Sequence, residues 1–256
     1  MKLSVVIITF NEEKHIRRCL ESVQDIADEI IVVDSFSTDK TEEICAEFHT
    51  TFLQQQFLGY KDQKNLALDT ASNDFVLSLD ADEALSSELK MSILQEKEKG
   101  FETDAYVMNR STFLGTKLIK HGTWYPDSKL RLINRKKGRW SGINVHEKIE
   151  MDSSVSVKKI KGDILHYSYN NFEEIIVQNN KYTSIQAKAM FERGKKAPAY
   201  KLVLNPLVAF INGYIFKLGF LDGLEGFFIA SSVAYQTMVK YAKLRKLHQL
   251  SPEQLP

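Results

Sequence analysis

The chain has 256 residues, of which 43% are hydrophobic and 26% are charged, and this composition excludes an intrinsically disordered protein. The formal net charge of +1 excludes a chain-wide surface for polyanions, so we expect no nucleic-acid partner. The charge is uneven, because residues 181–256 carry 11 Lys and Arg against 4 Asp and Glu, whereas residues 1–180 carry 23 against 29.

The N-terminus and the cysteines both indicate a reducing compartment. The first residues run directly into a strand pattern, without the long apolar segment of a signal peptide, so we expect a cytoplasmic protein. No stretch has the roughly 18 uninterrupted apolar residues of a membrane-spanning helix. Cys19 and Cys45 have no CxxC partner and no histidine cluster, which argues against zinc and against a disulfide framework. We expect both thiols to be reduced and to face the core.

Strand and helix patterns alternate over residues 3–100. Apolar, β-branched runs, typical of strands covered on both faces of a parallel sheet, occupy residues 3–10, 29–35 and 75–81. Helical patterns follow them over residues 11–23, 37–48, 61–71 and 86–100. Asn11 is expected to cap the first helix. This order predicts right-handed βαβ units in a mostly parallel central sheet flanked by helices.

The sequence pattern changes after residue 104. Short β-like pieces rich in Arg, Lys, Trp and Tyr extend to about residue 168, and helical patterns dominate from residue 170 onward. We therefore divide the chain into an α/β half at 1–105, a second part of the same domain at 106–169, and a helical C-terminal extension at 170–256.

Each of the three predicted strands ends in polar or acidic residues, at Thr9 to Glu12, Asp34 to Asp39 and Asp80 to Glu83. In open parallel sheets, ligands bind beyond the carboxyl ends of the strands, at the point where the strand order reverses. We therefore expect the three strand ends to direct their polar groups toward one crevice.

Asp80 and Asp82 follow a buried strand with one residue between them. Two carboxylates at such a place offer hard oxygen ligands that can hold Mg²⁺ or Mn²⁺ against a diphosphate, where the metal acts as a Lewis acid. The alternative is that these acids cap the next helix. Because no Lys or Arg separates the two aspartates, we expect a metal site rather than a plain salt bridge.

Four motifs in order resemble those of family 2 glycosyltransferases with the GT-A fold: SVVIITFNEE, EIIVVDSFSTDKT, QKNLAL and FVLSLDADEAL. The later segments KLRLINR, RWSGINVHEKI and GFLDGLEGF resemble the branch that includes bacterial lipopolysaccharide-core glucosyltransferases. The resemblance implies an α/β, Rossmann-like fold and a metal-dependent, inverting transfer of a hexose, glucose or galactose, from a UDP-sugar. The implied acceptor is a lipopolysaccharide-core or related glycan, or a glycolipid.

The resemblance also implies the donor site. Thr9, Asn11, Glu12 and Asp34 would line the uridine pocket, with Asp39 close by. Lys64 and Asn65 would lie near the ribose and phosphates, although a solvated helix face explains that lysine as well. Asp80 and Asp82 match the family's metal and diphosphate pair. Many members have two successive acids after the second strand, whereas this chain has Ser35 after Asp34, and a hydroxyl discriminates differently from a carboxylate.

An inverting transfer needs a general base for the acceptor hydroxyl. The resemblance points to Glu147 in NVHEKI, with His146 to orient the acceptor or the carboxylate, and Asp127 is the rival. The alternative for His146 and Glu147 is an exposed strand pair without chemistry. Arg131 lies between Leu130 and Leu132 in an alternating strand pattern, and we expect it to bind the diphosphate through its forked donors.

The C-terminal region combines apolar helices with the basic residues Lys240, Lys243, Arg245 and Lys246. Such helices fit a peripheral seat on an anionic membrane surface, here the inner face of the cytoplasmic membrane. A helical subdomain packed on the sheet and a homo-oligomer interface remain open alternatives. For the whole chain, the alternative function is a non-catalytic GT-A-fold protein that binds nucleotide sugars or glycans.

Overall fold

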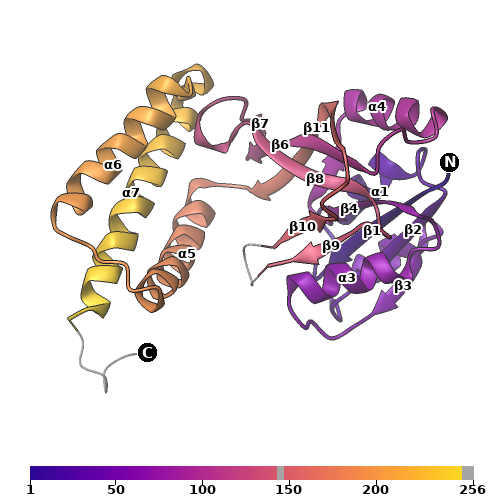
Figure 1. Cartoon of the computed structure of the whole chain (residues 1–256), viewed down its shortest axis with the longest axis horizontal. Helices are drawn as coiled ribbons and strands as arrows, with labels where there is room; N and C mark the ends of the chain where they lie inside the picture. The colour runs from indigo at the N-terminus through magenta and orange to yellow at the C-terminus, as the bar shows by residue number, and fades with distance from the viewer. Residues whose placement is uncertain (143–146, 250–256) are drawn as a thin grey trace. The chain divides into compact units, whose positions relative to one another are not determined.

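The computed structural model describes residues 1–142 and 147–249. The chain forms two compact units, of which the first contains residues 1–110 and 127–167 and the second contains residues 111–126 and 168–256 (Figure 1). Strands β6 and β11 run on from the first unit into the second.

The first unit is built on a sheet with the strand order β3-β2-β1-β4-β8-β6-β11-β5. Its strands are β1 (Leu3–Thr9), β2 (Glu29–Asp34), β3 (Thr51–Gln54), β4 (Phe75–Asp80), β5 (Glu83–Leu85), β6 (Ala105–Leu114), β8 (Asp127–Asn134) and β11 (Val157–Tyr169). Strands β9 (Gly138–Ser141) and β10 (Lys148–Met151) form a separate antiparallel pair. The helices of this unit are α1 (Ile16–Val23), α2 (Thr41–Ala46), α3 (Tyr60–Thr70) and α4 (Ser87–Glu98).

One half of the sheet is parallel and the other half is antiparallel. Strand β1 pairs in parallel with β2 and β4, and β2 pairs in parallel with β3. Strand β8 then runs antiparallel to β4 and β6, and β11 runs antiparallel to β5. The parallel half corresponds to the predicted βαβ units, and the antiparallel half makes the complete sheet mixed.

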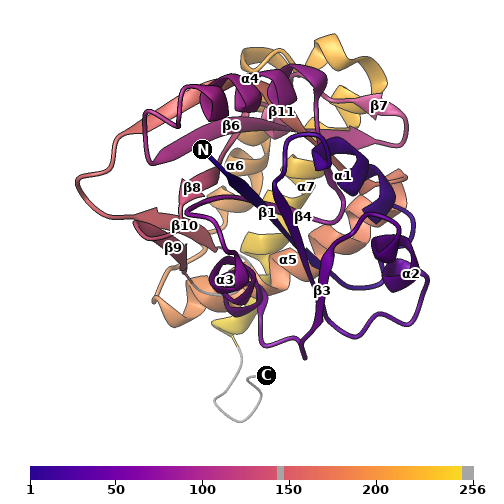
Figure 2. The same cartoon turned by 90° about the vertical axis from the view of Figure 1, so that its right-hand side faces the viewer.

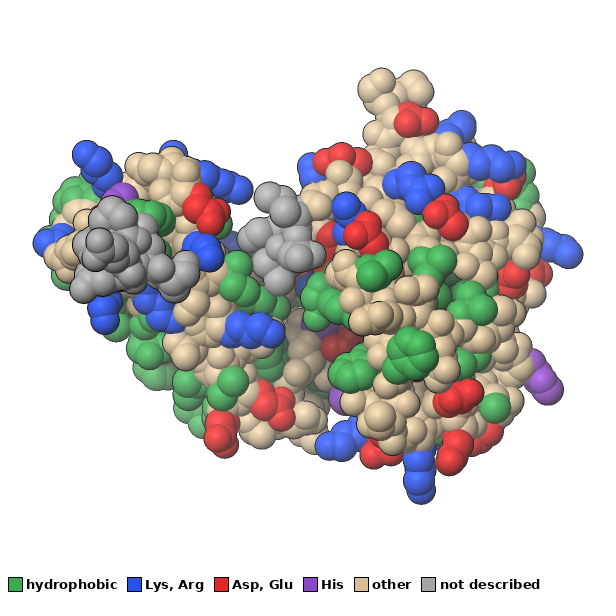
Figure 3. Space-filling view, turned by 90° about the horizontal axis from the view of Figure 1, so that it is seen from below, with side chains coloured by type: hydrophobic (Ala, Val, Ile, Leu, Met, Phe, Trp, Pro, Cys, Tyr) green, Lys and Arg blue, Asp and Glu red, His purple; other side chains and the backbone are tan. Residues whose placement is uncertain are grey.

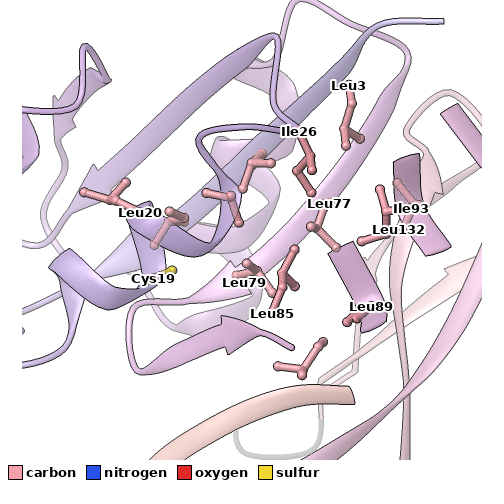
Figure 4. Close-up of a cluster of buried hydrophobic side chains, with 14 of the residues drawn as sticks. Leu3, Cys19, Leu20, Ile26, Leu77, Leu79, Leu85, Leu89, Ile93 and Leu132 are labelled. Atoms are coloured by element: carbon pink, nitrogen blue, oxygen red, sulfur yellow. The ribbon is translucent and has the colours of Figure 1, made fainter. Parts of the chain in front are cut away.

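The parallel strands are buried on both faces, which explains their continuous apolar runs. Alternate residues of β1, such as Leu3 and Ile7, belong to a core with Leu20 of α1 and Ile93 of α4 (Figure 4). Val6, between them, belongs to a second core on the opposite face, with residues of α3. In Figure 2, α1 and α4 lie on one side of β1 and β4, and α3 lies on the other. The prediction of buried, reduced cysteines is confirmed, since both thiols are free and buried.

The predicted helix cap at Asn11 is wrong. Helix α1 begins five residues later, at Ile16, and Asn11 has a left-handed backbone with φ of 54°. Its side-chain oxygen accepts a hydrogen bond from the backbone N of Thr38, 2.8 Å away, so it braces a neighbouring loop instead. Helix α4 has a conventional cap, because the hydroxyl of Ser86 accepts from the backbone N of Leu89. The acids after β4 therefore do not cap this helix.

The second unit is mostly helical. It contains the short strand β7 (Lys117–Leu118), a 3₁₀ turn (Gly122–Trp124) and the helices α5 (Phe172–Glu192), α6 (Tyr200–Ile211) and α7 (Gly223–Leu247). A π-helical turn (Asn212–Phe216) and a 3₁₀ turn (Gly219–Asp222) join α6 to α7, and we call residues 212–222 the elbow. Helix α7 packs against both α5 and α6 (Figure 1). Within the described part of the chain, only the bent pair Tyr200–Phe216 and Gly219–Leu247 meets the length and composition of a membrane segment, and no single helix does.

Candidate functional site

The carboxyl ends of β1, β2 and β4 lie side by side, as the sequence predicted. Thr9, the last residue of β1, is in register with Asp34, the last residue of β2. Asp80, at the end of β4, is in register with Ile8. The three polar segments that follow these strands therefore start from one edge of the sheet, where α/β proteins bind their ligands.

Asp34 and Thr9 occupy the buried part of this edge. The Asp34 carboxylate is fully buried and accepts a hydrogen bond from the backbone N of Ser37, 2.8 Å away. The hydroxyl of Ser35, which takes the place of a second acid, accepts from the side-chain amide of Gln63 at 3.2 Å. The Thr9 hydroxyl is buried and has no hydrogen-bond partner among the described residues. Such an unsatisfied group can bind a ligand.

Asn11, Glu12 and Asp39 join the two loops that follow β1 and β2. The side chain of Asn11 accepts from the backbone of Thr38, and the backbone N of Glu12 donates to the hydroxyl of Thr41 at 2.9 Å. One oxygen of the Asp39 carboxylate accepts from the backbone N of Glu13 in the first loop at 3.0 Å, and the other accepts from the backbone N of Thr41 at 3.0 Å. These bonds hold the first and second loops together, so Asn11 and Glu12, predicted for the uridine pocket, and Asp39, predicted close to it, shape the edge of the site.

Asp80 is held by two cations. Lys64 of α3 places its Nζ 2.9 Å from one carboxylate oxygen, and Arg131 of β8 places its Nη2 3.1 Å from the other. Our expectation that the aspartates avoid plain salt bridges is therefore wrong for Asp80, because the cations come from other elements of the chain. Burial alone would raise the pKa of Asp80, but Lys64 and Arg131 outweigh it and hold the pKa well below its usual range.

Glu83 holds both Arg131 and the backbone of Asp80. Its side chain is fully buried, and one carboxylate oxygen lies 2.8 Å from Arg131 Nη2 and 3.2 Å from Arg110 Nη1. The other oxygen accepts from the backbone N of Asp80 at 3.0 Å. Burial would lower the pKa of Arg131, but the charges of Glu83 and Asp80 raise it above its usual value, so this arginine stays charged. The sequence places Glu83 at the end of the third strand but does not indicate its ion pairs, because its partners are 27 and 48 residues away along the chain.

Asp82 faces a histidine that no sequence motif predicted. His166 of β11 places its Nε2 3.2 Å from a carboxylate oxygen of Asp82. Strand β11 brings it there by pairing with β5, where His166 is opposite Glu83. Both side chains are partly exposed, at 16% for His166 and 24% for Asp82. No local sequence signal identifies this histidine, because the pairing of β11 with β5 is long-range.

The donor atoms of Asp82 and His166 fit a divalent cation such as Mn²⁺. A carboxylate oxygen and an imidazole nitrogen lie 3.2 Å apart on two partly exposed side chains. Three or more His, Cys, Asp or Glu side chains do not gather around one point anywhere in residues 1–142 and 147–249. Two protein ligands leave positions for substrate oxygens, which is the usual manner in which such cations are bound at phosphate groups.

Trp140 of β9 lies beside Lys64 and Arg131. Lys64 Nζ lies 4.5 Å from the centre of its ring and Arg131 Cζ lies 5.4 Å away, so both cations are close to its π-face. Asn65 fixes this tryptophan by donating to its backbone carbonyl at 2.9 Å and accepting from its backbone N at 3.0 Å. Asn65, predicted to bind the donor, thus uses both ends of its amide to position Trp140.

The two candidate bases have different surroundings. Asp127 is engaged by cations, with Arg110 Nη2 2.9 Å from one oxygen and Lys129 Nζ 3.0 Å from the other. Glu147 directly precedes β10, and its Oε2 is buried and accepts no hydrogen bond from the part of the chain that the structure describes. His146 lies outside the described residues. Glu147 therefore has the less occupied carboxylate of the two.

The sequence matches the model of a known family, described as glycosyl transferase family 2, over residues 4–161. The chain belongs to glycosyl transferase family 2. It is therefore a glycosyltransferase, and the sheet flanked by helices with a helical C-terminal region confirms the predicted α/β GT-A fold class.

Relatives match along nearly the whole chain. An uncharacterized glycosyltransferase of Rickettsia typhi is 32% identical, over 96% of this chain and 87% of that protein. The lipopolysaccharide core biosynthesis glycosyltransferase LpsC of Rhizobium meliloti is 31% identical, over 98% of this chain and 94% of that protein. Among solved structures, S. aureus TarS 1–349 is 18% identical with a TM-score of 0.48, over 97% of this chain and 91% of that one.

Proposed function

We propose that this glycosyltransferase moves a hexose, glucose or galactose, from a UDP-sugar to a hydroxyl of a lipopolysaccharide-core or related glycan, with inversion and with a divalent metal. The observation that carries the proposal is the pairing of Asp82 with His166 beside the cations Lys64 and Arg131. A metal-ligand pair next to buried positive charge suits a nucleoside diphosphate as leaving group. The similarity to LpsC supports the acceptor class.

In this proposal, Asp82 and His166 would hold the Mg²⁺ or Mn²⁺ ion, which supplies Lewis-acid stabilisation of the charge on the departing diphosphate. Asp80 would also contribute a contact to the donor. Its two ion pairs leave lone pairs free, since a carboxylate can accept about four hydrogen bonds, and these suit a ribose hydroxyl. The metal-ligand role that the sequence suggested for Asp80 stays a prediction. Thr9 and Asp34 would bind the uracil end of the donor.

Glu147 is the proposed base. It would take the proton of the acceptor hydroxyl while that oxygen attacks the anomeric carbon and the bond from this carbon to the diphosphate oxygen breaks on the opposite face. Its unsatisfied Oε2 supports this choice, because Asp127 already has a cation at each oxygen. The orienting role of His146 stays a prediction.

The test separates binding from transfer. We expect Glu147→Gln to bind UDP-sugar as the wild type does and to lose at least about 100-fold of acceptor-dependent UDP release, the usual contribution of a general base. The matched variant Asp127→Asn should retain more activity. Near-normal turnover by Glu147→Gln would refute the assignment. If the intact protein binds the donor but releases no UDP with Mn²⁺ and any glycan acceptor, the alternative of a non-catalytic binding protein is correct.

The remaining expectations complete the proposal. Residues 1–105 would hold the nucleotide sugar, and residues 106–169 would carry the acceptor side and the base, although residues 111–126 and 168–169 belong to the helical unit. We place the enzyme in the cytoplasm, at the inner face of the cytoplasmic membrane, where the C-terminal helices contact the membrane or a second copy of the chain. A lipid-linked acceptor would make the membrane contact useful.

A further inference from the structure

The outer face of helix α6 is apolar, which is the reverse of the usual pattern in a globular protein. Its exposed residues recur with the helical spacing i, i+3, i+4, i+7, i+8, i+11, and they are Tyr200, Val203, Leu204, Leu207, Val208 and Ile211. This spacing places them on one side of the helix. Helix α6 packs on α7 with its other side, and none of its residues is buried.

The apolar surface continues through the elbow. Phe216 and Leu224 are 76% and 71% exposed, and Ile215, Leu218, Phe220 and Leu221 are also exposed. Figure 3 shows hydrophobic side chains along the helical unit, which lies at the left of the picture. A contiguous apolar surface of this kind marks a binding site for a protein or a membrane. We call the exposed residues of α6 and the elbow, together with Leu224, the apolar surface.

Charged residues are few in this part of the sequence; Lys217 is exposed, and both acids are paired within the helical unit. Between Leu202 and Val239 the charged residues are Lys217, Asp222 and Glu225. Asp222 has a side chain that is only 6% exposed and accepts from the backbone N of His121 at 2.7 Å. Glu225 pairs with Lys117 Nζ at 2.9 Å. The acids of this segment therefore have partners within the helical unit, which lowers the cost of placing the segment in an apolar medium.

Glycines allow close contacts between backbone segments at the elbow. A Cβ on Gly226 would lie 1.9 Å from the carbonyl oxygen of Gly219, and a Cβ on Gly219 would lie 2.6 Å from that of Gly213. Only glycine permits these backbone segments to approach so closely. The start of α7 is thereby held against the elbow, so that the apolar surface is a fixed shape.

Cations gather where α5 ends, α6 begins and α7 ends. His248 Nε2 lies 2.8 Å from the carbonyl oxygen of Lys195, and Arg245 donates to the carbonyl oxygen of Ala197 at 3.4 Å, so these chain segments adjoin. The exposed cations here are Arg193, Lys195, Lys196, Arg245 and Lys246. Figure 3 views this end of the unit and shows blue side chains around it. The group is complementary to anionic headgroups, and it would repel the same group on a second copy of the chain.

We propose that the apolar surface is a membrane seat: α6 and the elbow lie in the interfacial region of one leaflet, and the cation group contacts anionic lipid headgroups. This surface has the apolar face, the internally paired acids and the adjoining cations of an interfacial helix. The inference deepens the proposed function, because it names a bilayer with anionic lipids as the partner of the C-terminal helices. It stands on different residues from the donor site.

The test is flotation of the full-length protein with vesicles of phosphatidylcholine, alone or with about one third phosphatidylglycerol. We expect the wild type to float with the anionic vesicles. The Val208→Asp, Phe216→Asp double variant should lose at least about tenfold in bound fraction, since it places charges within the apolar surface. The control is Met91→Asp on α4, whose side chain is 62% exposed against 64% for Val208, and it should float as the wild type does. Lys195→Gln, Lys196→Gln, Lys246→Gln should abolish the preference for anionic vesicles.

Two results would overturn the inference. One is a wild-type protein that stays unbound with both vesicle compositions. The other is a wild-type dimer in analytical ultracentrifugation that the Val208→Asp, Phe216→Asp variant dissociates without any effect on flotation, which would make the surface a homodimer interface. UDP release with a soluble acceptor is measured on the same samples. If the wild type releases no UDP, the proposed function is refuted, whereas if the wild type does not float with either vesicle composition, the membrane seat is refuted.

Discussion

Replacement of Glu83 by Gln tests the charge network under the site. The substitution preserves shape but removes the negative charge that lies 2.8 Å from Arg131 and 3.2 Å from Arg110. The Glu83 side chain has no exposed surface, so water cannot replace the lost negative charge. Arg131 then keeps only its ion pair with the more exposed Asp80. Breaking a buried ion pair by removing one partner costs about 3 to 5 kcal/mol.

The assay is thermal unfolding followed by circular dichroism. For a chain of this size, each kcal/mol lowers the melting temperature by about 2 to 4 °C, so Glu83→Gln should lower it by about 6 to 12 °C at the lower limit of the cost. The control is Glu47→Gln, because Glu47 pairs with Arg17 at 2.6 Å in an exposed position. Solvent screens that pair, and we expect no measurable shift. Equal melting temperatures for the two variants would refute the argument from burial.

Three further predictions concern other parts of the chain. Burial raises the pKa of Cys45 to about 12, so the native protein should not react with a thiol reagent near pH 8, whereas the unfolded chain should show two reactive thiols. Gly226→Ala should destabilise the helical unit by more than about 2 kcal/mol in urea unfolding, because its Cβ meets the Gly219 carbonyl, while Gly194→Ala, with nothing within 4 Å, should cost only the strain of its left-handed backbone. Burial would raise the pKa of Glu29, but two serine hydroxyls lower it below its usual value. Its contribution to stability is therefore present above the unfolded pKa of about 4.3 and is lost as the pH falls below it, and Glu29→Gln should flatten the acid side of the stability profile.

The parallel half of the fold could be predicted because its signals are local. Continuous apolar runs mark β1, β2 and β4, and the periodic residues of α1 and α3 fall on the faces that the structure buries. The convergence of Thr9, Asp34 and Asp80 follows from this topology, since parallel neighbours end at the same edge.

The antiparallel half and the ion pairs depend on long-range pairing. Arg131 meets Asp80 only because β8 lies beside β4, and His166 meets Asp82 only because β11 pairs with β5. Asn11 failed as a cap because a neighbouring loop offers its side chain a backbone donor. In each case the partner comes from a segment that the local pattern does not identify.

Asp82 and His166 are proposed to hold the divalent metal at the donor diphosphate. The most direct test is to titrate the protein with Mn²⁺ in the presence of UDP and to measure free Mn²⁺ by electron paramagnetic resonance. We predict one Mn²⁺ bound per chain in the wild type, and at least about tenfold weaker binding in both Asp82→Asn and His166→Gln, since each removes a ligand. Glu150→Gln, an exposed acid on β10, should bind as the wild type does. Unchanged Mn²⁺ binding in Asp82→Asn would show that Asp82 is not a metal ligand.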